Sequence, residues 1–346
     1  MALFVLGAGC TRGSSFVVGR KSPCLPPLDT DFFTQLQRVR NGKHQMLINE
    51  VTRDVVELFG HNFNVTMETV FSTLEHTIRM LEITGETRDF NKTDLKARRD
   101  RLVQAIAGVF EEALTEPASV TPWDCLFHEK LVERHVQQMD DIVTFNYDCV
   151  LDYALKKKGD HKWNPRYGYG FHLGAKGSLL TGDEHWSPAI PAAKADTLHM
   201  YKLHGSLHFV IQTPTNERSS VRLKQHPYTK KKGSLRFTII PPEWHKAYHE
   251  GTFAVLWRKA AEALHRTKHL VVIGYSLPLT DLHATALFHT SIKRGNLRSL
   301  VVVNPDRMAR QRVRAAVQRG FTDQTRVLSF DTLRDFVDAE RGMWDV

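Results

Sequence analysis

The sequence predicts an α/β protein with a doubly wound parallel sheet and an inserted helical module. Short apolar runs, at residues 3–6, 269–273 and 300–303 among others, end in turn residues, as buried parallel strands do. Stretches with helical spacing follow the two later runs. A separate stretch, residues 30–138, carries several successive segments with apolar spacing near 3.6. Alternating strands and helices are typical of a parallel sheet covered by helices.

In chain order, residues 3–6 form the first strand and enter a glycine-rich turn. Residues 141–145 form the next, before a helix that begins near Asp148. Further strands are expected at residues 200–203, 207–211, 236–240, 269–273, 300–303 and 326–330. Helices are expected at residues 282–293, 307–319 and 332–340.

The helical stretch contains expected helices at residues 51–59, 67–81, 95–114 and 125–136. It interrupts the alternation of strands and helices. We therefore expect one domain over residues 1–346, with a Rossmann-like core from residues 1–29 and 139–346 and a helical insertion at residues 30–138. Residues 159–197 are rich in Gly, Pro, Trp and Tyr and predict a structured loop or lid.

The composition excludes several classes of protein. With 42% hydrophobic and 25% charged residues, the 346-residue chain is neither disordered nor fibrous. A formal charge of +9 favours anionic partners such as nucleic acid, an acidic protein or a phosphorylated cofactor. The four cysteines form no C-x-x-C pair, no basic segment precedes the apolar start, and no 18 apolar residues are consecutive. These features predict a cytoplasmic protein without a membrane span.

The turn after the first strand, GAG-x-T at residues 7–11, is a candidate phosphate site. Small residues allow a phosphate to approach backbone N–H groups. The alternative is that glycine is needed there for conformation alone. Gly7, Ala8, Gly9 and Thr11 are the candidate residues of this turn.

Two further strand ends carry polar side chains. Asp148 is well placed to cap the helix that follows residues 141–145, but capping leaves Asn146 unexplained, because a buried carboxamide needs partners. A sugar hydroxyl or a water would satisfy it. His204 follows another strand and can accept a proton from a hydroxyl, although most histidines are structural.

The strand ends at residues 274–278 and 303–306 complete the set. Gly274 and Ser276 can hold phosphate, and Asn304 or Asp306 can bind ribose hydroxyls. Pro278 and Pro305 are equally consistent with simple turns.

Taken together, these motifs resemble the sirtuin superfamily, and in particular the bacterial sirtuin-like domains of anti-phage defence proteins. The resemblance covers nearly the whole chain. It consists of GAG-x-T at residues 7–11, T-x-N-Y-D at 144–148, L-H-G-S at 203–206, G-Y-S-L-P at 274–278 and V-N-P-D at 303–306. The segment PPLDTDFF at residues 26–33 is also similar.

The resemblance implies that the sheet binds NAD and that Asn146 and His204 cleave the nicotinamide–ribose bond. Asp148 would hold the nicotinamide carboxamide or orient Asn146. The turn at residues 7–11 would bind the pyrophosphate. Gly274, Ser276 and Asn304 would lie near the adenosine half.

The chain departs from deacylating sirtuins in two ways. It has no cysteine beyond Cys149, and hence no four-cysteine zinc module after the H-G motif. It also lacks the G-I-P-D-F-R segment, in place of which GSSFVV stands at residues 13–18. Water is therefore the expected acceptor, with nicotinamide and ADP-ribose as products.

Other functions stay open. The chain could bind NAD or ADP-ribose as a sensor without turnover, or serve as a scaffold in a DNA-processing defence complex. The resemblance implies a homo-oligomer with a protein partner, first a HerA-like hexameric ATPase and second an Argonaute-like protein, with nucleic acid bound through the partner and no membrane contact. No metal is expected, although His245 and His249 are spaced to share one.

Overall fold

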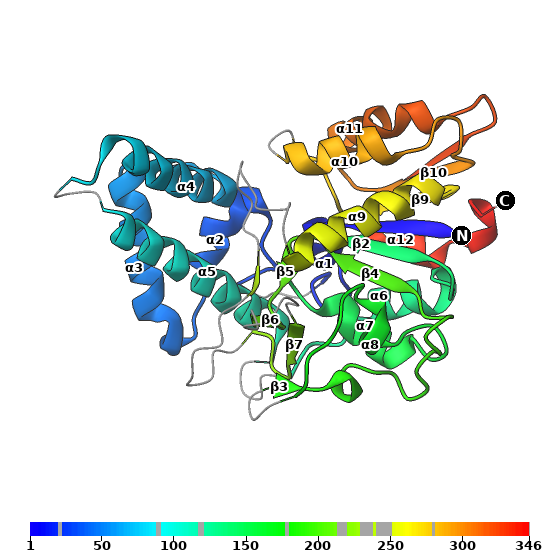
Figure 1. Ribbon diagram of the computed structural model, residues 1–346, viewed down its shortest axis with the longest axis horizontal. Coiled ribbons are helices and arrows are strands. Elements are labelled where there is room, and N and C mark those ends of the chain that lie inside the picture. Colours follow the sequence, from blue (N-terminus) through cyan, green and yellow to red (C-terminus); the bar gives the residue numbers. More distant parts are fainter. Residues whose placement is uncertain are drawn as a thin grey trace. The chain divides into compact units, whose positions relative to one another are not determined.

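The computed structural model describes residues 1–19, 23–87, 91–116, 121–176, 180–212, 220–228, 238–239, 251–278 and 281–345 (Figure 1). The chain divides into two compact units. The first comprises Met1–Arg20, Asp124–Pro227 and Ala247–Val346. The second comprises Lys21–Trp123 and Tyr228–Lys246.

The first unit is built on a six-stranded parallel sheet. Its strands are β1 (Ala2–Leu6), β2 (Asp141–Thr144), β4 (His199–Lys202), β9 (His269–Ile273), β10 (Ser299–Val303) and β11 (Arg326–Phe330). Their order across the sheet is β11-β10-β9-β1-β2-β4, and all neighbours are parallel. The first strand, β1, lies in the middle of the sheet. The strands β2 and β4 follow on one side of it, and β9, β10 and β11 then follow on the other side, which confirms the predicted doubly wound fold.

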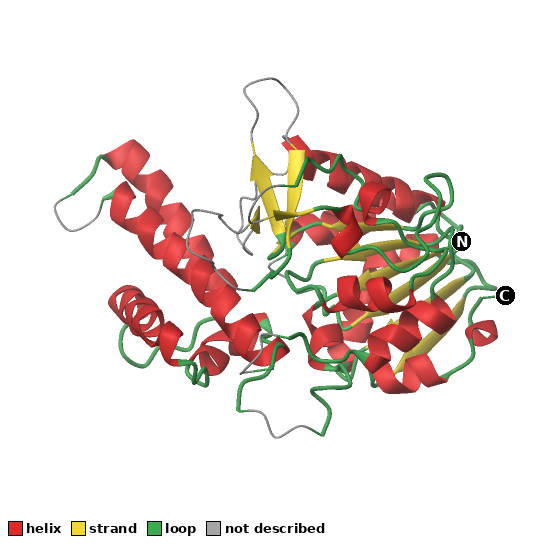
Figure 2. Cartoon of the chain, turned by 90° about the horizontal axis from the view of Figure 1, so that it is seen from below, coloured by secondary structure: helices red, strands yellow, loops and turns green. Residues whose placement is uncertain are grey.

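Helices cover both faces of this sheet (Figure 2). Because successive side chains of a strand point to opposite faces, Leu3 and Val5 pack with residues of α9, α10 and α11, whereas the ring of Phe4 contacts Trp344 on the other side. The helices described in this unit are α1 (Ala8–Arg12), α6 (Leu126–Lys130), η3 (Leu131–His135), α7 (Val150–Lys158), α8 (Pro165–Gly168), η4 (Asp183–His185), α9 (Gly251–Arg266), α10 (Leu282–Ser291), α11 (Arg307–Val317), η5 (Gln318–Gly320), α12 (Leu333–Asp338) and η6 (Arg341–Met343).

Two parts of this unit differ from the sequence prediction. Helix α9 was not predicted, although Leu256, Ala260, Ala263 and Leu264 are buried at helical spacing. The expected strand at residues 207–211 lies outside the parallel sheet. It corresponds to β6 (Phe209–Gln212), which pairs antiparallel with β7 (Ser220–Lys224), and β7 pairs with β3 (Leu180–Thr181). A short strand, β5 (Gly205–Ser206), precedes them.

The described part of the second unit is mainly helical. It contains η1 (Asp29–Asp31), α2 (Phe32–Leu36), η2 (Gly42–His44), α3 (Gln45–Phe59), α4 (Met67–Thr84), α5 (Lys92–Leu114) and the short strand β8 (Thr238–Ile239). Helices α3 and α4 both pack on α5, and Arg101 of α5 donates two hydrogen bonds to Asp54 of α3, at 2.7 and 2.9 Å. The expected insertion at residues 30–138 stays a prediction. In the structure, its last segment, residues 126–135, belongs to the first unit.

None of the helices in the described ranges combines the length and apolar character that crossing a membrane requires.

Candidate active site

The predicted site residues follow the carboxyl ends of neighbouring strands of the first unit. Leu6 of β1 is level with Thr144 of β2 and with Ile273 of β9, so the turns after these strands leave the sheet at the same edge. Strand β1 lies at the point where the strand order reverses. In open α/β sheets, ligands bind in the crevice beyond this point.

The glycines after β1 and β9 are explained by contact between the two turns. Gly9 N donates to Gly274 O at 2.9 Å, and a Cβ added at Gly274 would lie 2.0 Å from Cys10 N. A Cβ at Gly7 would lie 2.6 Å from Tyr275 Cα. Gly7 itself has a φ of −122°, so close approach, rather than a left-handed conformation, requires glycine there. Ala8, between the two glycines, is exposed at the start of α1.

Asn146 is oriented by Thr11. Asn146 Nδ2 donates to Thr11 Oγ1 at 3.2 Å, and Thr11 Oγ1 donates to Asp148 Oδ2 at 2.8 Å. Because the Thr11 hydroxyl gives its one hydrogen to Asp148, it can only accept from Asn146, and Asn146 Oδ1 faces elsewhere. Within the described part of the chain Oδ1 has no hydrogen-bond partner, although Asn146 is only 8% exposed. A buried carboxamide oxygen in this state fits a ligand or water that donates a hydrogen bond.

Asp148 is buried, and both of its carboxylate oxygens have partners. Oδ2 accepts from Thr11, and Oδ1 accepts from Val150 N at 2.9 Å, at the start of α7. Burial raises the pKa of Asp148, while Lys202 and these hydrogen bonds act in the opposite direction. With its oxygens occupied inside the protein, Asp148 is better placed to orient Thr11 and Asn146 than to hold nicotinamide.

His204 lies beside the segment that carries Asn146. Its ring centroid is 5.1 Å from that of Phe145 and 6.2 Å from that of Tyr147, the residues before and after Asn146. His204 is buried, and its Nε2 lies 3.8 Å from Asp281 Oδ2. The structure thus brings Asn146 and His204 into one buried cluster at the ends of adjacent strands.

Asp281 and Tyr275 are site residues that the sequence analysis missed. The Tyr275 hydroxyl donates to Asp281 Oδ2 at 2.8 Å, and the Tyr275 ring stacks on Phe145 with a centroid distance of 4.2 Å. Asp281 also caps α10, since its Oδ1 accepts from Ala284 N. The position of Asp281, directly before the predicted helix at residues 282–293, could have indicated a helix cap. The approach of Asp281 to His204 could not have been predicted, because it depends on tertiary structure.

Ser276 and Asn304 lie after β9 and β10. The Ser276 carbonyl accepts from Arg312 Nε of α11 at 3.0 Å. Asn304 Oδ1 accepts from Asp306 N at 3.0 Å and so shapes the turn before α11. Thr11, expected at the pyrophosphate, donates its hydroxyl hydrogen to Asp148. Contacts of these residues with adenosine or pyrophosphate stay predictions.

A comparison with known families identifies this arrangement. The SIR2-like domain family matches residues 140–322, more than half of the chain. The chain belongs to the SIR2-like family. SIR2-like domains bind NAD and are commonly NAD-dependent enzymes. The matched region includes Asn146, His204, Gly274 and Asn304, whereas the turn at residues 7–11 lies outside it. No match to a curated protein was found.

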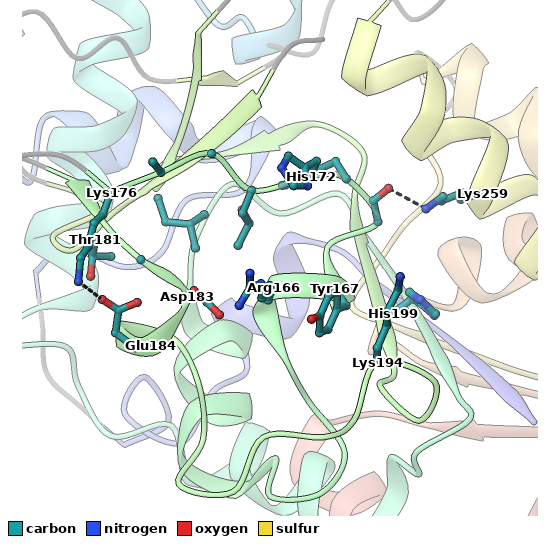
Figure 3. A pocket seen from close by; sticks show the side chains of 17 residues that line it. Arg166, Tyr167, His172, Lys176, Thr181, Asp183, Glu184, Lys194, His199 and Lys259 are labelled. Atoms are coloured by element: carbon teal, nitrogen blue, oxygen red, sulfur yellow. Dashed lines mark hydrogen bonds and ion pairs between the residues drawn. The ribbon is translucent and has the colours of Figure 1, made fainter.

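A cavity of about 930 Å³ in the first unit is lined by none of the predicted site residues (Figure 3). It lies beside the start of β4, where His199 lines it, whereas His204 follows the other end of that strand. Lys176 pairs with Glu184 at 2.9 Å on its wall, and Lys259 donates to Gly170 O at 2.8 Å. Tyr167 lines it as well, while Trp163 and Tyr169 of the predicted lid are fully buried.

No group of three or more His, Cys, Asp or Glu in the described ranges could hold a metal ion. His245 and His249, the pair considered from their spacing, lie outside the described residues. The four cysteines are buried, and none of them forms a disulfide.

Proposed function

We propose that this SIR2-like protein is an NAD glycohydrolase that cleaves the nicotinamide–ribose bond of NAD to give nicotinamide and ADP-ribose. The observation that carries the proposal is Asn146, whose NH₂ group is fixed by Thr11 and whose buried Oδ1 has no partner in the described part of the chain. The ring of the preceding residue, Phe145, lies 5.1 Å from that of His204, and both segments follow the carboxyl ends of parallel strands, where open α/β sheets bind ligands.

The two side chains suit the two needs of the reaction. Breaking the N-glycosidic bond leaves its electron pair on the nicotinamide ring nitrogen, so the leaving group departs as a neutral pyridine without an acid. Positive charge develops at the anomeric carbon, where a water oxygen forms the new bond. Asn146 Oδ1 would accept a hydrogen bond from that water or from a ribose hydroxyl, and His204 would accept the proton that the water loses.

Water is the proposed acceptor because the sequence lacks the parts with which deacylating sirtuins hold an acylated lysine. Cys149 is the last cysteine of the chain, so no four-cysteine zinc module follows the His204-Gly205 motif.

Product analysis tests this proposal. The purified full chain is incubated with NAD, with and without an acetyl-lysine peptide, and the products are separated by chromatography. We expect nicotinamide and ADP-ribose in equal amounts, unchanged by the peptide. Stoichiometric deacetylation of the peptide would overturn the choice of water, and binding of NAD without product would favour a nucleotide sensor or scaffold.

We also propose that the chain acts in anti-phage defence by depleting NAD, in a homo-oligomer joined to a HerA-like hexameric ATPase. The family resemblance suggests this partner, and the exposed Arg307 and Arg314 of α11 offer a basic surface. Co-elution of the two proteins in size-exclusion chromatography, lost in Arg307→Glu/Arg314→Glu, is the expected result. An Argonaute-like protein, with nucleic acid bound through it, is the second candidate partner.

A further inference from the structure

Lys202 is a buried lysine two residues before His204. It is 2% exposed, and its ammonium donates to the carboxylate of Asp152 at 2.8 Å and to the backbone carbonyl of Asp148 at 2.6 Å. Burial alone would lower the pKa of Lys202 and raise that of Asp152. Burial is the largest single effect on each group, but their mutual attraction together with the neighbouring charges and hydrogen bonds outweighs it, so the pKa of Lys202 is raised and that of Asp152 is lowered. The two side chains therefore form a charged pair inside the protein.

The pair belongs to a larger buried network. The Tyr169 hydroxyl donates to Asp152 Oδ1 at 2.6 Å and lies 3.1 Å from His208 Nε2. Since the tyrosine gives its hydrogen to Asp152, Nε2 must carry the proton of the His208 ring. His208 Nδ1 is then an acceptor, so the Ser206 hydroxyl at 2.8 Å donates to it, and the Sγ of Cys149 lies 3.1 Å away. Burial lowers the pKa of His208 to about 3, which keeps its ring neutral.

This network holds the turn that carries Asn146. The Tyr147 carbonyl accepts from Leu207 N at 2.9 Å, and the next carbonyl, that of Asp148, accepts from Lys202. The segment after β2 is thereby tied to the segment after β4. Asn146 precedes these two carbonyls, and His204 lies between Lys202 and Ser206.

A buried ion pair is weak as a source of stability, because the cost of removing both charges from water offsets most of their attraction. Such a pair instead restricts geometry, because each charge keeps its hydrogen-bond partners in only one arrangement of the two side chains. We propose that Lys202 is a positioning residue that fixes Asn146 relative to His204 by holding the Asp148 carbonyl and Asp152. This inference rests on the proposed function and names a residue that acts through the catalytic pair.

The test replaces Lys202 and Asp152 together, so that no unpaired charge stays buried. In Lys202→Met/Asp152→Asn both charges are removed, and the new carboxamide at position 152 still offers an oxygen to the Tyr169 hydroxyl. We expect kcat for nicotinamide release to fall by about 10- to 100-fold, as misplacement of a reacting group by about 1 Å does, with KM within about 3-fold.

A matched control lies at the other end of the same sheet. Arg341 pairs with Asp140, at 2.9 Å, just before β2 begins, and both side chains are largely buried. We expect Arg341→Met/Asp140→Asn to lower the melting temperature while leaving kcat unchanged. If kcat falls equally in both variants, or in neither, Lys202 has no positioning role.

A crystal structure of Lys202→Met/Asp152→Asn separates this inference from the proposed function. We expect Asn146 Nδ2 to move out of hydrogen-bond distance of Thr11 Oγ1. An unchanged Asn146–Thr11 contact would overturn the positioning role whether or not the wild-type chain hydrolyses NAD, and a wild-type chain without hydrolysis would overturn only the proposed function.

Discussion

The orientation of Asn146 depends on one hydroxyl, that of Thr11. This hydroxyl accepts from Asn146 and donates to Asp148, and the hydrogen-bonded groups are buried. In Thr11→Val the side chain at position 11 keeps nearly the same volume, but Asn146 and Asp148 each lose a hydrogen bond. We expect the free energy of unfolding to fall by about 1–3 kcal/mol and kcat for NAD hydrolysis to fall at least 10-fold, because the carboxamide is free to rotate.

Thr11→Ser is the control for this prediction, since it keeps the hydroxyl and removes only a methyl group. Urea unfolding and initial rates of nicotinamide release measure the two effects. A Thr11→Val protein with wild-type kcat would show that Asn146 does not need this partner.

At the scale of elements, the turns after β1 and β9 fit together with no room for a side chain at Gly274. A Cβ there would meet the backbone of residues 9 and 10, and Gly274 also has a φ of +61°. Backbone atoms cannot move aside to make room for the added Cβ, as the end of a flexible side chain can. We expect Gly274→Ala to lower the free energy of unfolding by about 3 kcal/mol or more and to weaken NAD binding.

Gly251 provides the comparison, because its φ is +64° and an added Cβ would meet no atom of the described residues within 4 Å. Gly251→Ala isolates the conformational cost, about 1 kcal/mol. Thermal unfolding of both variants is the measurement. Equal losses in the two proteins would mean that contact between the turns contributes little.

At the scale of the whole molecule, buried histidines make stability depend on pH. Burial lowers the pKa of His128 to about 4 and that of His208 to about 3. Near pH 8 these rings are neutral in both the folded and unfolded states and contribute nothing. As the pH falls below about 6.5, these histidines are protonated in the unfolded state but stay neutral in the folded state. The free energy of unfolding therefore falls, by about 2 kcal/mol for each histidine at pH 5.

His128→Gln removes one of these groups. The variant should lose about 2 kcal/mol less than the wild type between pH 8 and pH 5, measured by urea unfolding at both pH values. Identical losses would contradict the inferred burial of a neutral ring at His128.

Periodicity was enough to predict the parallel sheet, because strands such as residues 269–273 are buried on both faces and therefore almost wholly apolar. It did not predict that residues 207–211 leave this sheet, since an apolar run does not specify its pairing partner. Helix α9 was overlooked even though its apolar spacing was present.

For the site, motif order was sufficient to select Asn146 and His204, which the structure places in one cluster. The hydrogen bond from Thr11 to Asp148 and the approach of Asp281 to His204 could not be predicted, because these contacts join residues 77 to 137 positions apart that only the fold brings together.

We propose that the chain hydrolyses NAD and that Asn146 and His204 carry out the reaction. The most direct test is the rate of nicotinamide release from NAD by wild type, Asn146→Ala and His204→Ala, measured alongside NAD binding and repeated with the proposed HerA-like ATPase. We expect release by the wild type and a loss of at least about 100-fold in each variant, with binding retained. Equal release by all three proteins, or binding without release under every condition, would contradict the account.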